Sequence, residues 1–187
     1  MYNEIRKEVR FMELKGSKTE QNLMKAFAGE SQARNKYTYY ASKAKKDGYV
    51  QISALFEETA ENEKEHAKIW FKLLCDGEIK DTLTNLKDAA AGEYYEWTDM
   101  YKKFAKTAKE EGFEDISKLF NIIITVEKIH NKRFDKLIKD LEDDKIFKSA
   151  KPVLWECSNC GFHILSENAP EICPLCEHPK SYFFKEE

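Results

Sequence analysis

The helical part of this sequence repeats itself, which limits the fold to two copies of one unit. When the chain is shifted by 64 residues, residues 48–74 lie over residues 112–138, and 11 of the 27 pairs are identical. A shift of 63 places residues 28–30 over residues 91–93, Ala-Gly-Glu in both cases. In each copy the apolar residues recur three and four positions apart, which is the spacing of an amphipathic helix. The repeat therefore predicts two helical hairpins.

The first 150 residues contain no proline, because all four prolines lie at position 152 or beyond. Proline is the strongest helix breaker, so its absence favours long helices. Asp-Gly pairs at 47–48 and 76–77, and Gly112, mark the breaks between them. We predict four helices, over about residues 17–46, 52–75, 81–111 and 116–141. Joined by short connections, they form an up-and-down four-helix bundle or a crossover variant of one.

The composition excludes several classes of protein. The 187 residues carry 31 Lys and Arg against 34 Asp and Glu, a net charge of −3, and 42% of them are hydrophobic. Such a chain can bury a core, and it is not basic enough for a general nucleic-acid binder. No apolar run approaches the roughly 18 residues that span a bilayer, and the charged N-terminus lacks the apolar segment of a signal peptide. We expect a soluble, cytoplasmic protein that binds neither nucleic acid nor membrane.

The repeated polar residues lie on the apolar stripes of the predicted helices. Each copy has a Glu-x-x-His pair on one helix face and glutamates on the preceding helix. The residues are Glu63, His66, Glu127 and His130 for the pairs, and Glu30, Glu93 and Glu96 for the preceding helices. Counted from the turns, Glu30, Glu63, Glu93 and Glu127 lie near one level, roughly 25 Å away. These side chains are therefore expected to converge in one core.

Five carboxylates in one core would repel each other, and desolvation costs several kcal/mol per unpaired ion. Arg34 is the only cation near these stripes, so we expect two metal ions to supply the missing charge. A glutamate from each of two helices and a Glu-x-x-His pair from each of the other two form the ligand set of di-iron carboxylate bundles. The alternative is that these residues form solvated helix faces or ordinary core ion pairs.

Four of the five cysteines lie in the last 37 residues as two Cys-x-x-Cys pairs: Cys157, Cys160, Cys173 and Cys176. This spacing predicts a tetrathiolate metal site, and it does not separate iron from zinc. We therefore predict two domains, the bundle over residues 1–146 and a cysteine module over residues 152–187. We interpret Cys75 as a small buried hydrophobe. His163 and His178 are expected at the surface, because four thiolates complete a tetrahedral site.

Several stretches of the chain match a known family: AFAGESQARNKY (26–37), ETAENEKEHAK (58–68), AAGEYYEWTDMY (90–101) and VEKIHNKRF (126–134). The tail contains WECSNCGF and NAPEICPLC, and it resembles rubredoxin. Over about residues 14–187 the chain resembles the rubrerythrins. The resemblance implies a mainly α fold, a ferritin-like four-helix bundle followed by a small rubredoxin-like domain with a four-cysteine metal site. Two departures are visible: the stretch between Glu63 and Glu93 is shorter than usual, and the segment before Leu14 has no counterpart.

The resemblance also implies a role for each ligand. Two irons, oxo- or hydroxo-bridged when oxidised, are bridged by Glu63 and Glu127, and a third iron is bound by the four cysteines. The remaining assignments are Glu30 and Glu96 on one iron, Glu93 and His130 on the other, and His66 in place of Glu96 when the site is reduced. Tyr37 and Tyr101 lie near Glu30 and Glu96 in helical register. Each tyrosine either hydrogen-bonds a ligand carboxylate or only packs in the core.

Rubrerythrins are peroxidases that reduce hydrogen peroxide to water, with the four-cysteine iron as electron relay. The resemblance implies this activity, with rubredoxin or an NADH-dependent rubredoxin reductase as electron donor. It also implies a homodimer or higher oligomer in which each tail docks beside the partner's di-iron site. The alternatives are a ferroxidase that handles iron and a non-enzymatic zinc-ribbon interaction module.

Overall fold

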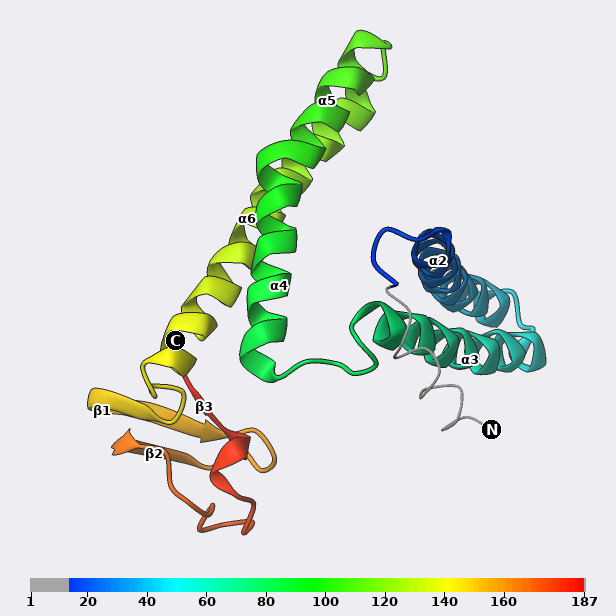
Figure 1. Ribbon diagram of the computed structural model, residues 1–187. Helices are drawn as coiled ribbons and strands as arrows, with labels where there is room; N and C mark the ends of the chain where they lie inside the picture. The colour runs from blue at the N-terminus through cyan, green and yellow to red at the C-terminus, as the bar shows by residue number, and fades with distance from the viewer. Residues whose placement is uncertain (1–13, 187) are drawn as a thin grey trace. The chain divides into compact units, whose positions relative to one another are not determined.

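The computed structural model describes residues 14–186, and residues 1–13 and 187 lie outside the described part. The chain divides into two compact units between Lys80 and Asp81. Figure 1 identifies the elements of each unit, which are described separately below. The N-terminal extension noted in the sequence falls on residues outside the described part.

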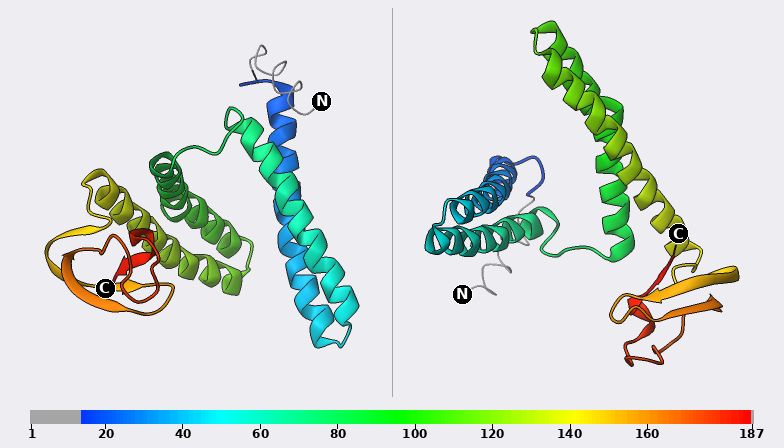
Figure 2. Two further views of the ribbon diagram at one scale, coloured as in Figure 1. Left: turned by 90° about the horizontal axis from the view of Figure 1, so that it is seen from below. Right: turned by 180° about the vertical axis from the view of Figure 1, so that it is seen from behind.

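The first unit is a helical hairpin of α2 (Lys18–Lys46) and α3 (Val50–Leu74). Helix α2 begins at the predicted cap, where the Ser17 hydroxyl accepts from the Glu20 amide at 3.0 Å. The chain turns at Gly48, whose φ of 86° favours glycine. The two helices lie side by side in both views of Figure 2. Small side chains allow this close approach, and the buried ones are Ala41, Ala44, Ser53, Ala60 and Ala67.

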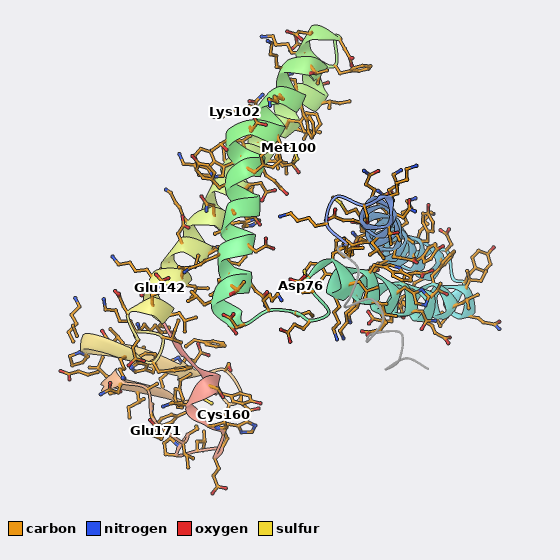
Figure 3. The ribbon with its side chains drawn as sticks, viewed as in Figure 1. Asp76, Met100, Lys102, Glu142, Cys160 and Glu171 are labelled. Atoms are coloured by element: carbon orange, nitrogen blue, oxygen red, sulfur yellow. The ribbon has the colours of Figure 1, made fainter. Side chains whose placement is uncertain are left out.

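Helix α3 ends in a tight turn rather than in an extended segment. The Gly77 amide donates to the Lys72 carbonyl at 2.6 Å, and the Glu78 amide donates to the Cys75 carbonyl. Asp76 and Gly77 both have positive φ, 58° and 94°, as is common where a helix ends in a left-handed cap. Figure 3 labels Asp76 at this end of α3. The residues that join α3 to the next helix are therefore few and partly curled.

The second unit begins with helices α4 (Thr82–Tyr95) and α5 (Tyr101–Glu110), which are joined by the π-helical segment η1 (Glu96–Met100). The prediction of one regular helix over residues 81–111 is therefore wrong in its middle. The Tyr101 amide donates to the Glu96 carbonyl, five residues back, which is the π-helical pattern. This segment accounts for the change of shift in the repeat, because a π turn takes up one extra residue.

Helix α6 (Glu114–Glu142) returns along α4, η1 and α5, and Asp143 caps its end. A three-stranded antiparallel sheet follows, with the order β2-β1-β3. Its strands are β1 (Lys148–Cys157), β2 (His163–Asn168) and β3 (Phe183–Lys185), and the 3₁₀ turn η2 (Lys180–Tyr182) precedes β3. The sheet domain has its own core of Trp155, Cys157, Ala169, Cys173 and Phe183.

The structure confirms the four predicted helical regions, and it places the four cysteines in a small sheet domain with its own core. The proposed domain limits, 1–146 and 152–187, stay a prediction. Among the described residues, no helix has the length and apolar character needed to cross a membrane.

Candidate metal centres

The first hairpin brings three of the predicted ligands together. Ligand atoms of Glu30 on α2 and of Glu63 and His66 on α3 lie within 4.8 Å of one another. The His66 Nδ1 lies 2.8 Å from the Glu63 Oε2, because residues three apart share a helix face. His66 is exposed, with 53% of its side chain accessible, whereas Glu63 is mostly covered at 18%. The hairpin thus presents a cluster of two carboxylates and one imidazole.

The second hairpin repeats this cluster with Glu93 on α4 and with Glu127 and His130 on α6. The His130 Nδ1 lies 2.7 Å from the Glu127 Oε2 and 3.5 Å from the Glu93 Oε2. The two clusters correspond residue by residue through the repeat. Each offers oxygen and imidazole nitrogen atoms, which suit a divalent metal such as iron.

Glu93 in the second cluster has an environment that suits a metal ligand. Its Oε2 is buried without a hydrogen-bond partner. Burial, a hydrogen bond with Glu127 and the repulsion of the Glu127 charge raise the pKa of Glu93, Glu96 adds to this, and only His130 opposes it. A buried acceptor without a partner costs free energy. A metal ion at this point would remove that cost, so the residues present fit the iron that such a ligand set holds.

Glu96 lies at the start of the π segment, outside the Glu93, Glu127 and His130 cluster but near enough to act on it. Its charge contributes to the raised pKa values of Glu93 and Tyr101. The first hairpin has Ala33 where a shift of 63 places Glu96. The extra carboxylate therefore belongs to the second hairpin alone. The signal for the π turn was present in the sequence, since the shift changes from 63 before it to 64 after it.

The two predicted tyrosines occupy equivalent places. Tyr37 packs on Phe56 with ring centroids 6.0 Å apart, and Tyr101 packs on Phe120 at 5.8 Å. Burial, and then the charges of Glu96, Glu127 and Glu93, raise the pKa of Tyr101. Tyr101 is therefore kept protonated beside the carboxylates. Hydrogen bonding of either tyrosine to a ligand stays a prediction.

Two residues beside the second cluster were missed by the sequence analysis. The Trp97 Nε1 donates to the Asn131 Oδ1 at 3.2 Å, and the Asn131 amide donates to the Ala90 carbonyl at 3.1 Å. Asn131 is a buried polar residue, so both bonds fix the packing of α4 and η1 against α6. A polar residue one position after the predicted ligand His130, on the face that packs against α4, was the available signal.

The four cysteines of the sheet domain also converge. The Sγ atoms of Cys157 and Cys176 are 3.7 Å apart, as are those of Cys160 and Cys173. A tetrahedral ion with metal–sulfur bonds of about 2.3 Å requires sulfur atoms about 3.8 Å apart. The cluster therefore fits one tetrahedral ion, and Figure 3 labels Cys160 in this domain.

The thiols of this cluster differ in acidity. Burial and the neighbouring thiols raise the pKa of Cys160 to about 12. The backbone amide of His178 lowers the pKa of Cys176 to about 6.

Of the remaining predictions, His163 is exposed as expected, but His178 is half-buried. Its Nδ1 donates to the Cys176 carbonyl at 3.0 Å, and its ring packs on Tyr182. Cys75 is half-buried as well.

Comparison with known proteins identifies the family to which the chain is similar over most of its length. A family model described as rubrerythrin matches residues 21–138, and one described as the rubredoxin-like domain of rubrerythrin matches residues 155–184. Rubrerythrin-1 of Clostridium acetobutylicum is 50% identical, over 91% of this chain and 95% of that protein. The rubrerythrin of Clostridium perfringens is 52% identical over 92% and 97%, and that of Nitratidesulfovibrio vulgaris is 46% identical over 91% and 95%. The side-chain clusters of a di-iron centre and of a four-cysteine centre lie within the matched residues, and the chain belongs to the rubrerythrin family.

Proposed function

We propose that this protein is a non-haem di-iron peroxidase that reduces hydrogen peroxide to water. The observation that carries the proposal is the duplicated cluster, two carboxylates and one imidazole in each helical hairpin. Glu30, Glu63 and His66 are one half of the ligand set, and Glu93, Glu96, Glu127 and His130 are the other. We assign Glu63 and Glu127 as the bridging ligands, because each is the mostly covered member of its Glu-x-x-His pair.

Two ferrous ions, when bound, supply the two electrons that break the oxygen–oxygen bond of peroxide. The chain's own residues must supply protons, since peroxide takes up two protons as it becomes two waters. Without iron, Glu93 holds a proton more readily than an ordinary carboxyl group, because burial and Glu127 raise its pKa, but it gives this proton up when it binds a cation. Tyr101 keeps its hydroxyl proton, because burial and the charges of the carboxylates raise its pKa. Tyr101 is therefore the residue proposed to hold a proton beside the ligand carboxylates.

The four-cysteine site is the proposed entry point for electrons. The Sγ positions fit one tetrahedral ion, and iron in such a site carries one electron at a time, whereas zinc carries none. Rubredoxin or an NADH-dependent rubredoxin reductase is the proposed donor. Free thiolate ligands of this kind persist in a reducing compartment, so we place the reaction in the cytoplasm.

The test separates the two metal centres in the full-length chain. Protein with iron in both centres, reduced without oxygen, should reduce one equivalent of peroxide per di-iron centre and should turn over with the donor. A preparation with zinc in the four-cysteine site should react once with peroxide after chemical reduction, but it should lose donor-dependent turnover. Equal turnover of both preparations would contradict the relay role of the four-cysteine iron.

The same preparation distinguishes a ferroxidase. A ferroxidase would consume dioxygen with added ferrous iron and would accumulate a ferric mineral. The proposed peroxidase should prefer peroxide over dioxygen and should hold no more than three irons per chain, two in the helical centre and one on sulfur. A zinc-ribbon module without redox chemistry would show neither reaction.

A further inference from the structure

The connection between α3 and α4 is short. It consists of residues 75–81, between Leu74 and Thr82. Its first part is curled onto the end of α3 by the hydrogen bonds of Gly77 and Glu78. Its last residue, Asp81, already caps α4 by accepting from the Thr84 amide at 3.0 Å. Even if all seven residues were extended, the eight steps from Leu74 to Thr82 would reach at most about 29 Å.

A ferritin-like bundle needs a longer connection at this point. Bundles of this class contain one long crossover, which returns the chain along the bundle, so the helices before and after it run in the same direction. Leu74 lies 11 residues beyond Glu63, and Thr82 lies 11 residues before Glu93. With Glu63 and Glu93 at one level on such helices, the two ends are separated by 22 residues of helical rise, about 33 Å. One chain cannot bridge that distance with residues 75–81.

Each hairpin, taken by itself, leaves an apolar stripe exposed around its cluster. On α3 the stripe includes Ile52 and Leu55, which are 47% and 63% exposed, and it continues to His66. On α6 the equivalent stripe includes Leu119, 61% exposed, and continues to His130. An amphipathic helix normally buries such a stripe against another element. Both hairpins therefore need a second helical layer over the cluster, and each cluster holds only half of the ligand set.

We infer that two copies of this chain exchange their hairpins. The α2–α3 hairpin of one copy closes a bundle with α4, η1, α5 and α6 of the second copy, and the reverse pair closes the other bundle. Each di-iron centre then takes Glu30, Glu63 and His66 from one chain and Glu93, Glu96, Glu127 and His130 from the other. The connection 75–81 only passes from one bundle to the next, so it needs no crossover. This inference rests on the di-iron centre proposed above.

Complementation between two damaged chains tests the exchange. One tagged chain carries Glu63→Ala with His66→Ala, and a second chain with a different tag carries Glu127→Ala with His130→Ala. The chains are co-expressed, and mixed dimers are purified through both tags. Exchange puts both damaged halves in one bundle and both intact halves in the other. We call the iron bound by the helical clusters the helical iron, as distinct from the four-cysteine iron. The mixed dimer should therefore bind half the helical iron of the wild-type dimer, while each parent binds none.

Iron is counted by metal analysis, and the four-cysteine iron is subtracted by its visible absorption. A mixed dimer without helical iron would overturn the exchange, because closure within one chain leaves both of its centres damaged. Such a result, together with iron and peroxide reduction in the wild-type chain, would leave the proposed function intact. Restored iron without peroxide reduction would support the exchange and contradict the function.

A second measurement does not depend on metal. A flexible segment of about 20 Gly and Ser residues, inserted after Lys80, spans about 25 Å on average and more when stretched, so it permits closure within one chain. Wild-type dimers can trade subunits only by opening both bundles, which is as slow as unfolding. The insertion should raise the rate of subunit exchange, followed by fluorescence transfer between labelled dimers, by at least about 100-fold.

The control is the same segment inserted after Lys145, between α6 and β1, which leaves the connection 75–81 unchanged. Its rate should equal that of the wild type. Equal rates for all three chains, or a monomeric wild-type chain, would overturn the exchange even if no helical iron were bound.

Discussion

The two helical hairpins have the same basic construction and differ at one turn. In both, a buried serine on the second helix donates to a carbonyl of the first: the Ser53 hydroxyl to Ala41 at 2.9 Å, and the Ser117 hydroxyl to Ala105 at 2.7 Å. An aromatic pair also joins the two helices of each hairpin. Tyr40 packs on Phe56 and Phe104 packs on Phe120, with ring centroids 5.6 and 5.7 Å apart. Both sets correspond by a shift of 64. The turn end of each hairpin is therefore the same structure built twice.

The difference begins at the π segment of the second hairpin. One extra residue there changes the repeat shift from 63 at Glu93 to 64 at Tyr101, and the segment carries Glu96 and Trp97. Trp97 packs beside α6, with the Lys128 ammonium 5.2 Å from its ring centroid. The equivalent part of the first hairpin is an open groove of about 360 Å³, lined in part by Arg34, Lys64 and Ala67.

A single added residue thus gives the second hairpin an additional carboxylate and a filled interface, while the first hairpin keeps only its cluster of two carboxylates and one imidazole. In the proposed metal centre, the duplicated side chains would form the symmetric part, and Glu96 of the π segment would add the asymmetric part.

The prediction with the largest expected effect concerns the equal contribution of the two hairpins to the proposed metal centre. Glu63→Ala and Glu127→Ala should each abolish helical iron binding, because a bridging carboxylate serves both ions. The four-cysteine iron should remain, since it lies in the sheet domain. Iron per chain, together with the visible absorption of the four-cysteine site, measures both. Retention of both helical irons in either variant would contradict the bridging assignment of that residue.

The positions of the helices and the clusters followed from the sequence because they depend on local rules. Proline-free stretches, Asp-Gly breaks and the Glu-x-x-His spacing act over a few residues, so Glu63 with His66 and Glu127 with His130 were predicted on one face and are found there. The Cys-x-x-Cys pairs are local in the same sense, and their four sulfur atoms converge as expected.

Other features depend on the comparison of distant segments. The π turn is not visible in residues 96–100 alone, because their helix-forming tendency is ordinary. It appears only when the two shifts are compared. Asn131 is similar: its role is set by Trp97 and Ala90, 34 and 41 residues away. His178 was expected at the surface, but the fold of the cysteine loop brings it against Tyr182.

The second prediction removes a feature that only the second hairpin has. Asn131→Ala should lower the free energy of unfolding by about 2–3 kcal/mol, because the partly buried Trp97 Nε1 loses its acceptor and the Ala90 carbonyl loses a donor. Urea unfolding of the iron-free protein measures this. Asn121→Ala is the control, since the exposed Asn121 amide donates only to a carbonyl of its own helix. An equal, small change in both variants would show that the Asn131 network does not stabilise the hairpin.

The third prediction tests a feature that both hairpins share. Ser53→Ala and Ser117→Ala should each lower the free energy of unfolding by about 0.5–1 kcal/mol, the net value of one buried hydrogen bond reduced by the better helix propensity of alanine. The two changes should agree, because the two bonds occupy equivalent places in the repeat. A clear difference between the variants, in the same urea measurement, would mean that the turn ends of the hairpins are not equivalent in stability.

The smallest predicted effect concerns the pH dependence of the iron-free protein. Burial, and then the Glu127 carboxylate, raise the pKa of Glu93 in the folded chain. The folded state therefore binds this proton more tightly than the unfolded state, and the contribution is complete below the ordinary glutamate pKa of about 4.3. It is lost as the pH rises through the raised value, so stability falls in that window.

Glu93→Gln removes the titrating group, so the free energy of unfolding of the iron-free variant should fall less than that of the wild type as the pH rises from about 4.3 to neutrality. The difference should be small, because 23% of the Glu93 side chain is exposed and water screens its charge. Urea unfolding at a series of pH values gives the two slopes. With iron bound, the wild-type slope should weaken, since the cation then stabilises the Glu93 carboxylate. A variant slope at least as steep as the wild-type slope would show that Glu93 does not hold a proton in the iron-free protein.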